Sequence, residues 1–176
     1  MATADGATPS VASEGGRRQY LTFMLGRETF ALGILAIREI IQYSVPTDVP
    51  MVPPHIRGVI NLRGAVVPVI DLSAWFGRGI ASVARRTCIL VIELSVKGRA
   101  QTLGVIVDSV TKVVWIADAD IEPPPAFGGA VRTEFIAGLG KAVGRFVVIL
   151  DPDRVFGMEA LRDASVAAAA AAPAAA

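Results

Sequence analysis

The segment Val59-Ile-Asn-Leu-Arg-Gly-Ala-Val-Val-Pro-Val-Ile-Asp71 decides the fold, because it predicts two short strands joined by a tight turn. Val and Ile favour strands, and the Arg63-Gly64 pair between the two apolar runs provides the turn. Pro68 cannot donate a hydrogen bond to a neighbouring strand, which places its strand at a sheet edge or at a bulge. The stretch from Phe135 to Asp151 repeats this pattern and also ends in an aspartate.

The segments that precede these two hairpins are related as well. From Tyr20 to Ile40, apolar segments surround a glycine turn, and the same arrangement recurs from Cys88 to Val110. The order is therefore A, B, A-like, B-like, which predicts two related small barrels rather than one large sandwich. We expect strands at 20–25, 28–32, 59–62, 66–71, 88–94, 101–107, 113–116, 136–139 and 145–150.

Helices are expected to be few and short in this mainly β chain. Ile34, Ile37 and Ile41 fall at helical spacing and predict one helix. Two more are predicted at 73–76 and 153–161, and each follows an aspartate that can cap it.

Both ends of the chain look unlike its middle. The first residues lack hydrophobic periodicity, and the last form an alanine tract without an apolar face that would dock on the barrels. We therefore expect a disordered tail over 1–18, a structured unit of two barrel subdomains over 19–162 and an alanine-rich tail over 163–176.

Composition excludes several classes of protein. Lys and Arg number 17 against 16 Asp and Glu in 176 residues, so little charge is available to neutralise the phosphates of a nucleic acid. The 53% of hydrophobic residues excludes a chain that is mainly disordered. Charged or turn-forming residues interrupt every apolar stretch before the roughly 20 residues that a membrane-spanning helix needs. With no secretory signal at the start, we expect a cytoplasmic protein without membrane insertion.

The chain offers little for catalysis or metal binding. Cys88 and His55 are its only cysteine and histidine, which is too few for a Cys/His zinc site or a disulfide. We predict no catalytic residue, no metal and no cofactor. His55 is expected to be an exposed loop residue, and Cys88 a small residue of the core or of a groove. Asp71 and Asp151, at equivalent strand ends, are expected to cap the turns that follow.

Two classes of function remain open from the residues alone. An enzyme or small-ligand protein would use a cleft between the barrels, with Asp108 or Glu39 as its acid or base. That reading requires Glu39, Asp108 and Arg63 to converge on a cavity, and we expect that they do not. An interaction module requires apolar barrel surface, and the apolar residues of 104–114 outnumber what one small barrel can bury. Their excess predicts either a seam between the barrels or a groove for a partner.

Six blocks of the chain, in order and spacing, resemble the CheW family of bacterial chemotaxis coupling proteins. The likeness runs from about Tyr20 to Leu161. The matching blocks are Phe23-Met-Leu-Gly26 with Phe30-Ala-Leu32; Ile37-Arg-Glu-Ile40; Ile56-Arg-Gly-Val-Ile-Asn-Leu-Arg-Gly64; Val67-Pro-Val-Ile-Asp-Leu72; Gly104-Val-Ile-Val-Asp108; and Thr133-Glu-Phe-Ile-Ala-Gly-Leu-Gly140. The resemblance implies two five-stranded SH3-like barrels packed around a shared core.

The same resemblance implies a non-catalytic adaptor that couples chemoreceptors, the methyl-accepting chemotaxis proteins, to the histidine kinase CheA. Its implied partners are the regulatory domain of that kinase and the cytoplasmic tips of the receptors, and its implied place is the membrane-associated receptor array. A CheW-like coupling protein of another chemosensory pathway, such as twitching motility, would look the same. Carried over by position, the implied partner-binding residues are Ile37, Glu39, Gly58, Arg63, Cys88, Val110 and Val113. The apolar members are assigned to grooves, and Glu39 and Arg63 to polar positioning.

Overall fold

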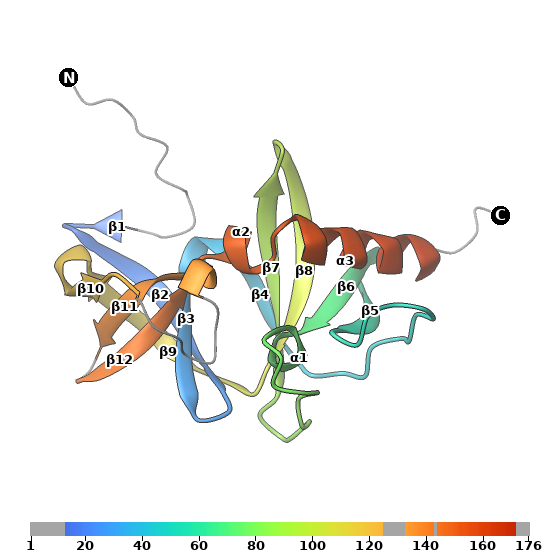
Figure 1. Cartoon of the computed structure of the whole chain (residues 1–176), viewed down its shortest axis with the longest axis horizontal. Helices are drawn as coiled ribbons and strands as arrows, with labels where there is room; N and C mark the ends of the chain where they lie inside the picture. Colours follow the sequence, from blue (N-terminus) through green and yellow to red (C-terminus); the bar gives the residue numbers. More distant parts are fainter. Residues whose placement is uncertain (1–12, 125–132, 143, 172–176) are drawn as a thin grey trace.

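The computed structural model describes residues 13–124, 133–142 and 144–171. Figure 1 shows two β-rich units side by side, with the last helix lying across the second of them. Each unit combines strands that are far apart in the sequence, so neither is a continuous piece of chain.

Barrel 1 is built from two separate segments of the chain, residues 13–33 and 109–150. Its strand order is β1-β2-β3-β12-β11-β10, and β9 pairs with β2 outside that path. Its five long strands are β2 (Arg17–Leu25), β3 (Glu28–Gly33), β9 (Ser109–Ala117), β11 (Ile136–Ala142) and β12 (Arg145–Leu150). Two strands of two residues each extend the sheet, β1 (Ser13–Glu14) and β10 (Ile121–Glu122).

Barrel 2 holds the middle of the chain, in the strand order β4-β7-β8-β6-β5. Its strands are β4 (Ile37–Gln42), β5 (Ile56–Leu62), β6 (Ala65–Asp71), β7 (Cys88–Val96) and β8 (Arg99–Val107). The chain that leaves β4 bridges to β5, where the amides of Thr47 and Val59 each donate to the carbonyl of the other, at 2.8 and 2.9 Å. This bridge closes the barrel.

The predicted repeat is confirmed by the sheet topology. Each barrel joins two antiparallel hairpins through one parallel pair, β3 with β12 in barrel 1 and β8 with β6 in barrel 2. In both barrels the hairpin that begins with an Ile-x-Gly sequence carries a register shift there, at Ile56/Gly58 and at Ile136/Gly138. The mainly β, double-barrel expectation is therefore correct.

The helices are short, apart from the last. They are η1 (Ile34–Ala36), α1 (Leu72–Trp75), η2 (Asp118–Asp120), η3 (Thr133–Phe135), α2 (Pro152–Val155) and α3 (Met158–Ala171). Asp71 caps α1 by accepting a hydrogen bond from the Ala74 amide at 3.2 Å, and Asp151 caps α2 by accepting one from the Asp153 amide at 3.1 Å. The predicted capping roles of both aspartates are confirmed.

The helix predicted from Ile34, Ile37 and Ile41 is wrong. Only one 3-10 turn forms, and the chain from Ile37 onward is strand β4, paired with β7. Exposure alternates along β4, with Arg38, Ile40 and Gln42 exposed, which is the two-residue period of a strand. β-branched isoleucines favour a strand when a neighbour supplies backbone hydrogen bonds, and β7 supplies them.

Neither tail follows its predicted boundary. Residues 1–12 and 172–176 lie outside the described part of the chain, but β1 and the start of β2 fall within the tail expected over 1–18. The alanine tract belongs to α3, whose Ala164 and Ala167 are buried in the largest core cluster. The expectation that this tract has no docking face was wrong, because small side chains let a helix backbone approach closely and alanine has the highest helix propensity.

Pro68 was expected at a sheet edge or at a bulge, and the structure places it beside a bulge. Its strand β6 lies between β8 and β5 and is therefore not an edge. Pro68 pairs with Val59 immediately beside the register shift at Ile56/Gly58, and the pairing of β6 with β8 begins one residue later, at Val69. The backbone N–H that Pro68 lacks is therefore not needed for hydrogen bonds to either neighbouring strand.

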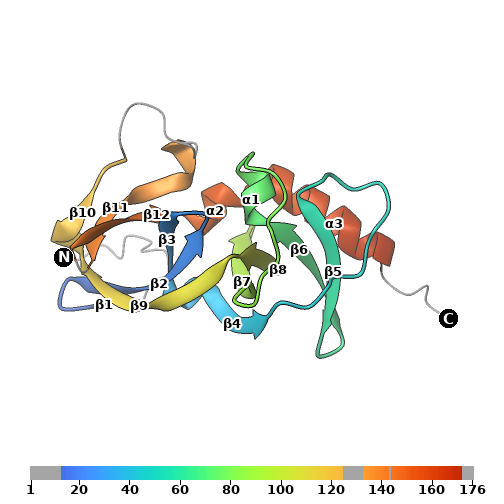
Figure 2. The same ribbon diagram turned by 90° about the horizontal axis from the view of Figure 1, so that it is seen from below.

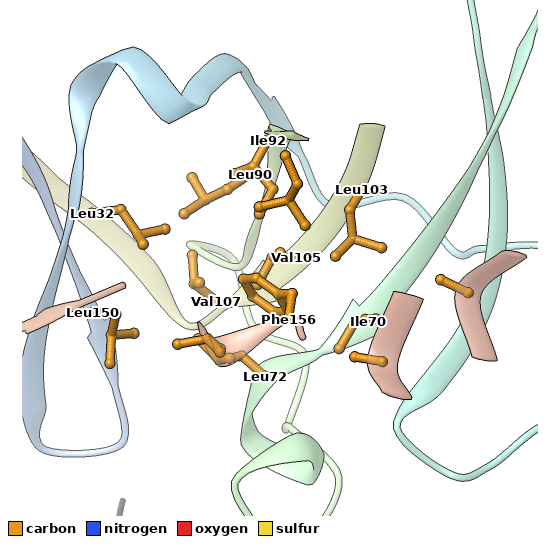
Figure 3. Close-up of a cluster of buried hydrophobic side chains, with 14 of the residues drawn as sticks. Leu32, Ile70, Leu72, Leu90, Ile92, Leu103, Val105, Val107, Leu150 and Phe156 are labelled. Carbon is orange, nitrogen blue, oxygen red and sulfur yellow. The ribbon is translucent and has the colours of Figure 1, made fainter. Parts of the chain in front are cut away.

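One hydrophobic core is shared by the two barrels. Figure 3 shows Phe156, which follows α2, among side chains from both barrels. Leu32 and Leu150 come from barrel 1, while Ile70 and Leu90 are among those from barrel 2. Because these residues exclude water jointly, we expect the barrels to unfold together.

Barrel 1 also has a small interior cluster of its own, which includes Tyr20, Val114 and Ile116. Burial raises the pKa of the Tyr20 phenol above its ordinary value of 10.0; Arg18 opposes this shift and Asp118 adds to it. The folded state thus holds the Tyr20 proton more tightly than the unfolded chain does, so this group costs stability as pH rises above about 10.

Between pH 9 and pH 11, the unfolding free energy of the variant Tyr20→Phe should fall less than that of the unsubstituted protein. The difference should be roughly 1.4 kcal/mol for each unit by which folding raises the pKa of Tyr20. Urea denaturation of both proteins at each pH measures the difference. Parallel stability curves above pH 10 would contradict this expectation.

Candidate functional site

The residues expected to bind partners fall into two groups on different barrels. Ile37, Glu39, Gly58, Arg63 and Cys88 belong to barrel 2. Val110 and Val113 belong to β9 of barrel 1. Figure 2 shows β9 and β4 along the lower side of the molecule, with the tip of the β5–β6 hairpin further right.

Glu39 and Arg63 meet although their strands lie at opposite edges of the barrel 2 sheet. Arg63 Nη2 donates to Glu39 Oε1 at 3.1 Å. The contact exists because barrel closure brings β4 and β5 together around the Thr47–Val59 bridge. The Arg63 side chain is 77% exposed, so one face of its guanidinium stays available to a partner while Glu39 fixes its direction.

Arg63 occupies the two-residue turn between β5 and β6 that the sequence predicts. Arg63 and Gly64 have φ angles of 52° and 87°, and Asn61 Oδ1 accepts a hydrogen bond from the Gly64 amide at 2.9 Å. Two successive positive φ values are the geometry of a tight hairpin turn. A non-glycine residue at positive φ is strained, so the turn holds an arginine at the cost of some stability.

Gly58 is buried in β5 and offers no side chain to a partner. Its φ is +135°, and a Cβ atom added there would lie 2.1 Å from the carbonyl oxygen of Thr47. The glycine therefore permits the close approach that closes barrel 2 beside Arg63. Any effect of Gly58 on binding is expected to act through the backbone.

Ile37 and Cys88 mark the two ends of the β4–β7 pair. Ile37 lies opposite Ile92, and Cys88 lies opposite Gln42. Both Ile37 and Cys88 are half-buried and pack against the shared core. The expectation that Cys88 is a small core or groove residue is correct, and its Sγ lies 3.2 Å from the carbonyl oxygen of Arg86.

On barrel 1, Val110 and Val113 lie on the face of β9 that borders the shared core. Val110 pairs with Phe23 and packs against that core, and Val113 pairs with Leu21 and is 45% exposed. Trp115, two residues beyond Val113 on the same face, is 39% exposed. We call Val110, Val113 and Trp115 the β9 strip. Sequence reasoning missed Trp115, although its alternation with buried Val114 and Ile116 was a usable signal.

The groups of the enzyme alternative do not form one cluster. Asp108 Oδ2 accepts a hydrogen bond from the Gly26 amide at 2.6 Å, and the Asp108 amide donates to the Met24 carbonyl at 3.1 Å. Asp108 thus fixes the β2–β3 turn of barrel 1, whereas Glu39 is paired with Arg63 on barrel 2. Each carboxylate has a structural partner of its own.

Among the described residues, no three histidine, cysteine or carboxylate side chains gather as metal ligands would. In the same part of the chain, no helix has the length and apolar character needed to cross a membrane.

His55 is not the exposed loop residue that the sequence predicted. Its ring lies 4.6 Å from that of Trp75, between centroids, and its Nε2 lies 3.3 Å from Asp163 Oδ2 on α3. Trp75 in turn donates from Nε1 to the Val155 carbonyl at 2.7 Å and stacks with Phe135. The prediction failed because α3 and α1, both distant in sequence, cover this loop.

The closed barrels, the exposed strip on β9 and the fixed arginine at a hairpin tip define a protein-interaction module of the SH3-like double-barrel class. The family described as CheW-like domain matches residues 19–160. This chain therefore belongs to the CheW family of chemotaxis coupling proteins.

Named relatives and a solved structure agree with that membership. Chemotaxis protein CheW of Rhizobium meliloti is 33% identical over 82% of this chain and 90% of that protein. Protein FrzA of Myxococcus xanthus is 32% identical over 72% and 76% of the two chains. The crystal structure of scaffolding protein TtCheW from Thermoanaerobacter tengcongensis superposes with a TM-score of 0.71 at 32% identity and covers 81% of this chain and 94% of that one.

Proposed function

We propose that this chain is a non-catalytic adaptor that binds the regulatory domain of a CheA-type histidine kinase through barrel 2 and the cytoplasmic tips of chemoreceptors through the β9 strip. The separation of the two groups of residues onto different barrels is the observation that carries the proposal. An adaptor has to hold two partners at once, and surfaces on separate barrels leave room for both.

The barrel 2 surface suits a folded domain. It presents Glu39 and Arg63 as an oriented ion pair, and exposed Ile40 follows Glu39 in the edge strand β4, on the opposite face of that strand. β4 is an edge strand of its sheet, and a related barrel of the kinase can approach that edge. The charged pair then fixes the orientation of the complex, and the surrounding apolar surface supplies affinity.

The β9 strip suits a helix. Its exposed apolar side chains form a narrow row along one strand, which is the complement of the apolar stripe of an amphipathic helix. If the receptor changes its signalling geometry, the adaptor transmits the change through differential affinity rather than through chemistry. We further propose that the protein is cytoplasmic and works at membrane-associated receptor arrays.

Calorimetric titration of the full chain with each partner tests this function. We expect saturable binding to both the kinase regulatory domain and a receptor-tip fragment. Each partner should still bind when the other is saturating. Competition between the two partners would contradict separate surfaces. Failure to bind any CheA-type kinase would remove the coupling role.

A second candidate is coupling in another chemosensory pathway, such as twitching motility. The FrzA relative, which does not bear the CheW name, is 32% identical to this chain, as is CheW of Klebsiella aerogenes over a longer stretch. Titration against each CheA-type regulatory domain of the same organism separates the candidates, because the true partner should bind at least 10-fold more tightly than its paralogues.

The variant Arg63→Asn should weaken kinase binding while leaving stability almost unchanged. Asparagine tolerates the positive φ of this turn, so the hairpin is kept while the guanidinium is lost. We expect a loss of about 10-fold in affinity for the regulatory domain, since an oriented charge at an interface contributes on the order of 1–3 kcal/mol. Unfolding free energy should change by less than about 1 kcal/mol, as for other exposed ion pairs.

Titration calorimetry and urea denaturation measure the two quantities on the same preparation. Arg145→Asn, at an exposed arginine of barrel 1 at the start of β12, is the matched control and should bind the kinase domain normally. Equal affinity of Arg63→Asn and the unsubstituted chain would show that Arg63 is only a turn residue.

A further inference from the structure

Trp115 and Arg17 together form an aromatic and cationic end to the β9 strip. The Arg17 guanidinium carbon lies 5.1 Å from the centroid of the Trp115 ring, within the range of a cation–π contact. The neighbouring Arg18 is paired with Asp118 at 3.1 Å. Among the described residues no carboxylate pairs with Arg17, so its charge faces solvent over an exposed indole.

Sheet register places this end in line with the rest of the strip. Leu21 lies opposite Val113, Gln19 opposite Trp115, and Arg17 opposite Ala117. Directly opposed residues of antiparallel strands share a face of the sheet. The row therefore begins at Leu21 in the shared core and runs outward along barrel 1 to Arg17.

Arg17 lies outside the part of the chain that the family match covers, which begins at residue 19. The short strand β1 holds it in place, because Glu14 pairs with Arg17 and Ser13 with Arg18 in antiparallel register. The cation at the end of the strip thus comes from a residue that precedes the family match.

The spacing of the row matches that of an α-helix. Val113 and Trp115 are two strand residues apart, a rise of about 6.7 Å. Helix residues four positions apart rise by about 6 Å. A helix lying along β9 therefore places two apolar side chains, one turn apart, against Val113 and Trp115, and a residue one further turn along beside Arg17.

We propose that Trp115 and Arg17 determine which receptor helices this chain binds. They select an amphipathic helix that carries two apolar residues one turn apart and an aspartate or glutamate one turn beyond them. The inference rests on the proposed function, because it takes the β9 strip as the receptor surface. The indole supplies a large, rigid contact area, and the guanidinium supplies a partner for the carboxylate.

Calorimetric titration of the full chain with two receptor-tip fragments tests this selection. One fragment carries the aspartate or glutamate, and in the other that residue is replaced by the corresponding asparagine or glutamine. We expect Trp115→Ala to weaken binding of both fragments by about 10- to 30-fold, as for an aromatic anchor. Arg17→Gln should weaken binding of the carboxylate fragment by about 3- to 5-fold and leave the amide fragment unaffected. The Arg17 effect should shrink as salt is raised.

Controls keep the result interpretable. Phe146→Ala removes another exposed aromatic residue of barrel 1, from β12, and should leave receptor binding unchanged. Kinase-domain binding should be unchanged in all three variants, which shows that they are folded.

The outcomes separate this inference from the proposed function. If Val113→Asp abolishes receptor binding while Trp115→Ala and Arg17→Gln bind normally, the selection by Trp115 and Arg17 is overturned and the coupling function stands. An equal effect of Arg17→Gln on both fragments would overturn the carboxylate preference. Absence of receptor binding by the unsubstituted chain would overturn the proposed function and this inference with it.

Discussion

Gly58→Ala is expected to destabilise the protein by more than about 3 kcal/mol, a large share of the 5–15 kcal/mol by which a domain is usually stable. The added Cβ would lie 2.1 Å from the Thr47 carbonyl oxygen and 2.8 Å from its carbon, and neither is a flexible side-chain atom that can move aside. The φ of +135° adds strain for any residue with a side chain. Relief requires the Thr47–Val59 bridge to open, and barrel 2 would then lose its closure.

Gly64→Ala provides the matched control for Gly58→Ala. Gly64 also has a positive φ, +87°, but a Cβ atom there would meet nothing within 4 Å. Its substitution should therefore cost only the conformational strain, about 1–2 kcal/mol. Urea denaturation of the two variants separates the steric clash from the strain, and similar losses in both would refute the role assigned to the Thr47 contact.

The Gly58 variant also bears on the residues proposed to bind partners. Because Gly58 is buried, any loss of kinase binding in Gly58→Ala should follow the fraction of unfolded protein and should be partly restored by lowering the temperature. Arg63→Asn, in contrast, should lose binding in a fully folded protein. The comparison distinguishes a residue that shapes the surface from one that contacts the partner.

Phe156→Ala should have the second large effect, a loss of about 3–5 kcal/mol of unfolding free energy. Phe156 is 1% exposed and lies among buried side chains of both barrels (Figure 3). Removing its ring leaves a cavity at the place where the barrels share their core, and a protein of this size should melt roughly 10 °C lower. Differential scanning calorimetry measures the shift.

The shape of the melting transition is as informative as its midpoint. A single calorimetric transition is expected both with and without Phe156, because one core cluster spans the two barrels. Two separate transitions in the unsubstituted protein would contradict the shared core. Phe146→Ala is the control, since Phe146 is 58% exposed and its loss should change stability by less than about 0.5 kcal/mol.

Each of the strands expected from local sequence signals is present, and so is their repeat. Runs of Val and Ile with glycine turns predict strand pairs, and the two Ile-x-Gly hairpins lead to equivalent bulges at Gly58 and Gly138. The Asp71 and Asp151 caps were predictable because a cap depends on neighbours within a few residues. The same local reasoning failed at Ile37–Gln42, where helical spacing of isoleucines competed with strand pairing to a distant β7.

The site was predicted only in part. Resemblance pointed to Glu39 and Arg63, but not to their contact, which depends on closure of barrel 2. It placed Val113 on β9 without Trp115 or Arg17, whose stacking depends on the register of β2 with β9. His55 was expected in solvent, and α3 brings Asp163 to it.

The sequence by itself determined the class of fold, the repeat, the turn at Arg63-Gly64 and the family, because these depend on short-range propensity and on the order of motifs along the chain. Only the tertiary structure decided which strands exchange between the barrels, that the alanine tract docks as α3, and which side chains meet at the two surfaces proposed for binding. Those features arise from contacts between residues tens of positions apart, whose gain in buried surface and backbone pairing outweighs local preference.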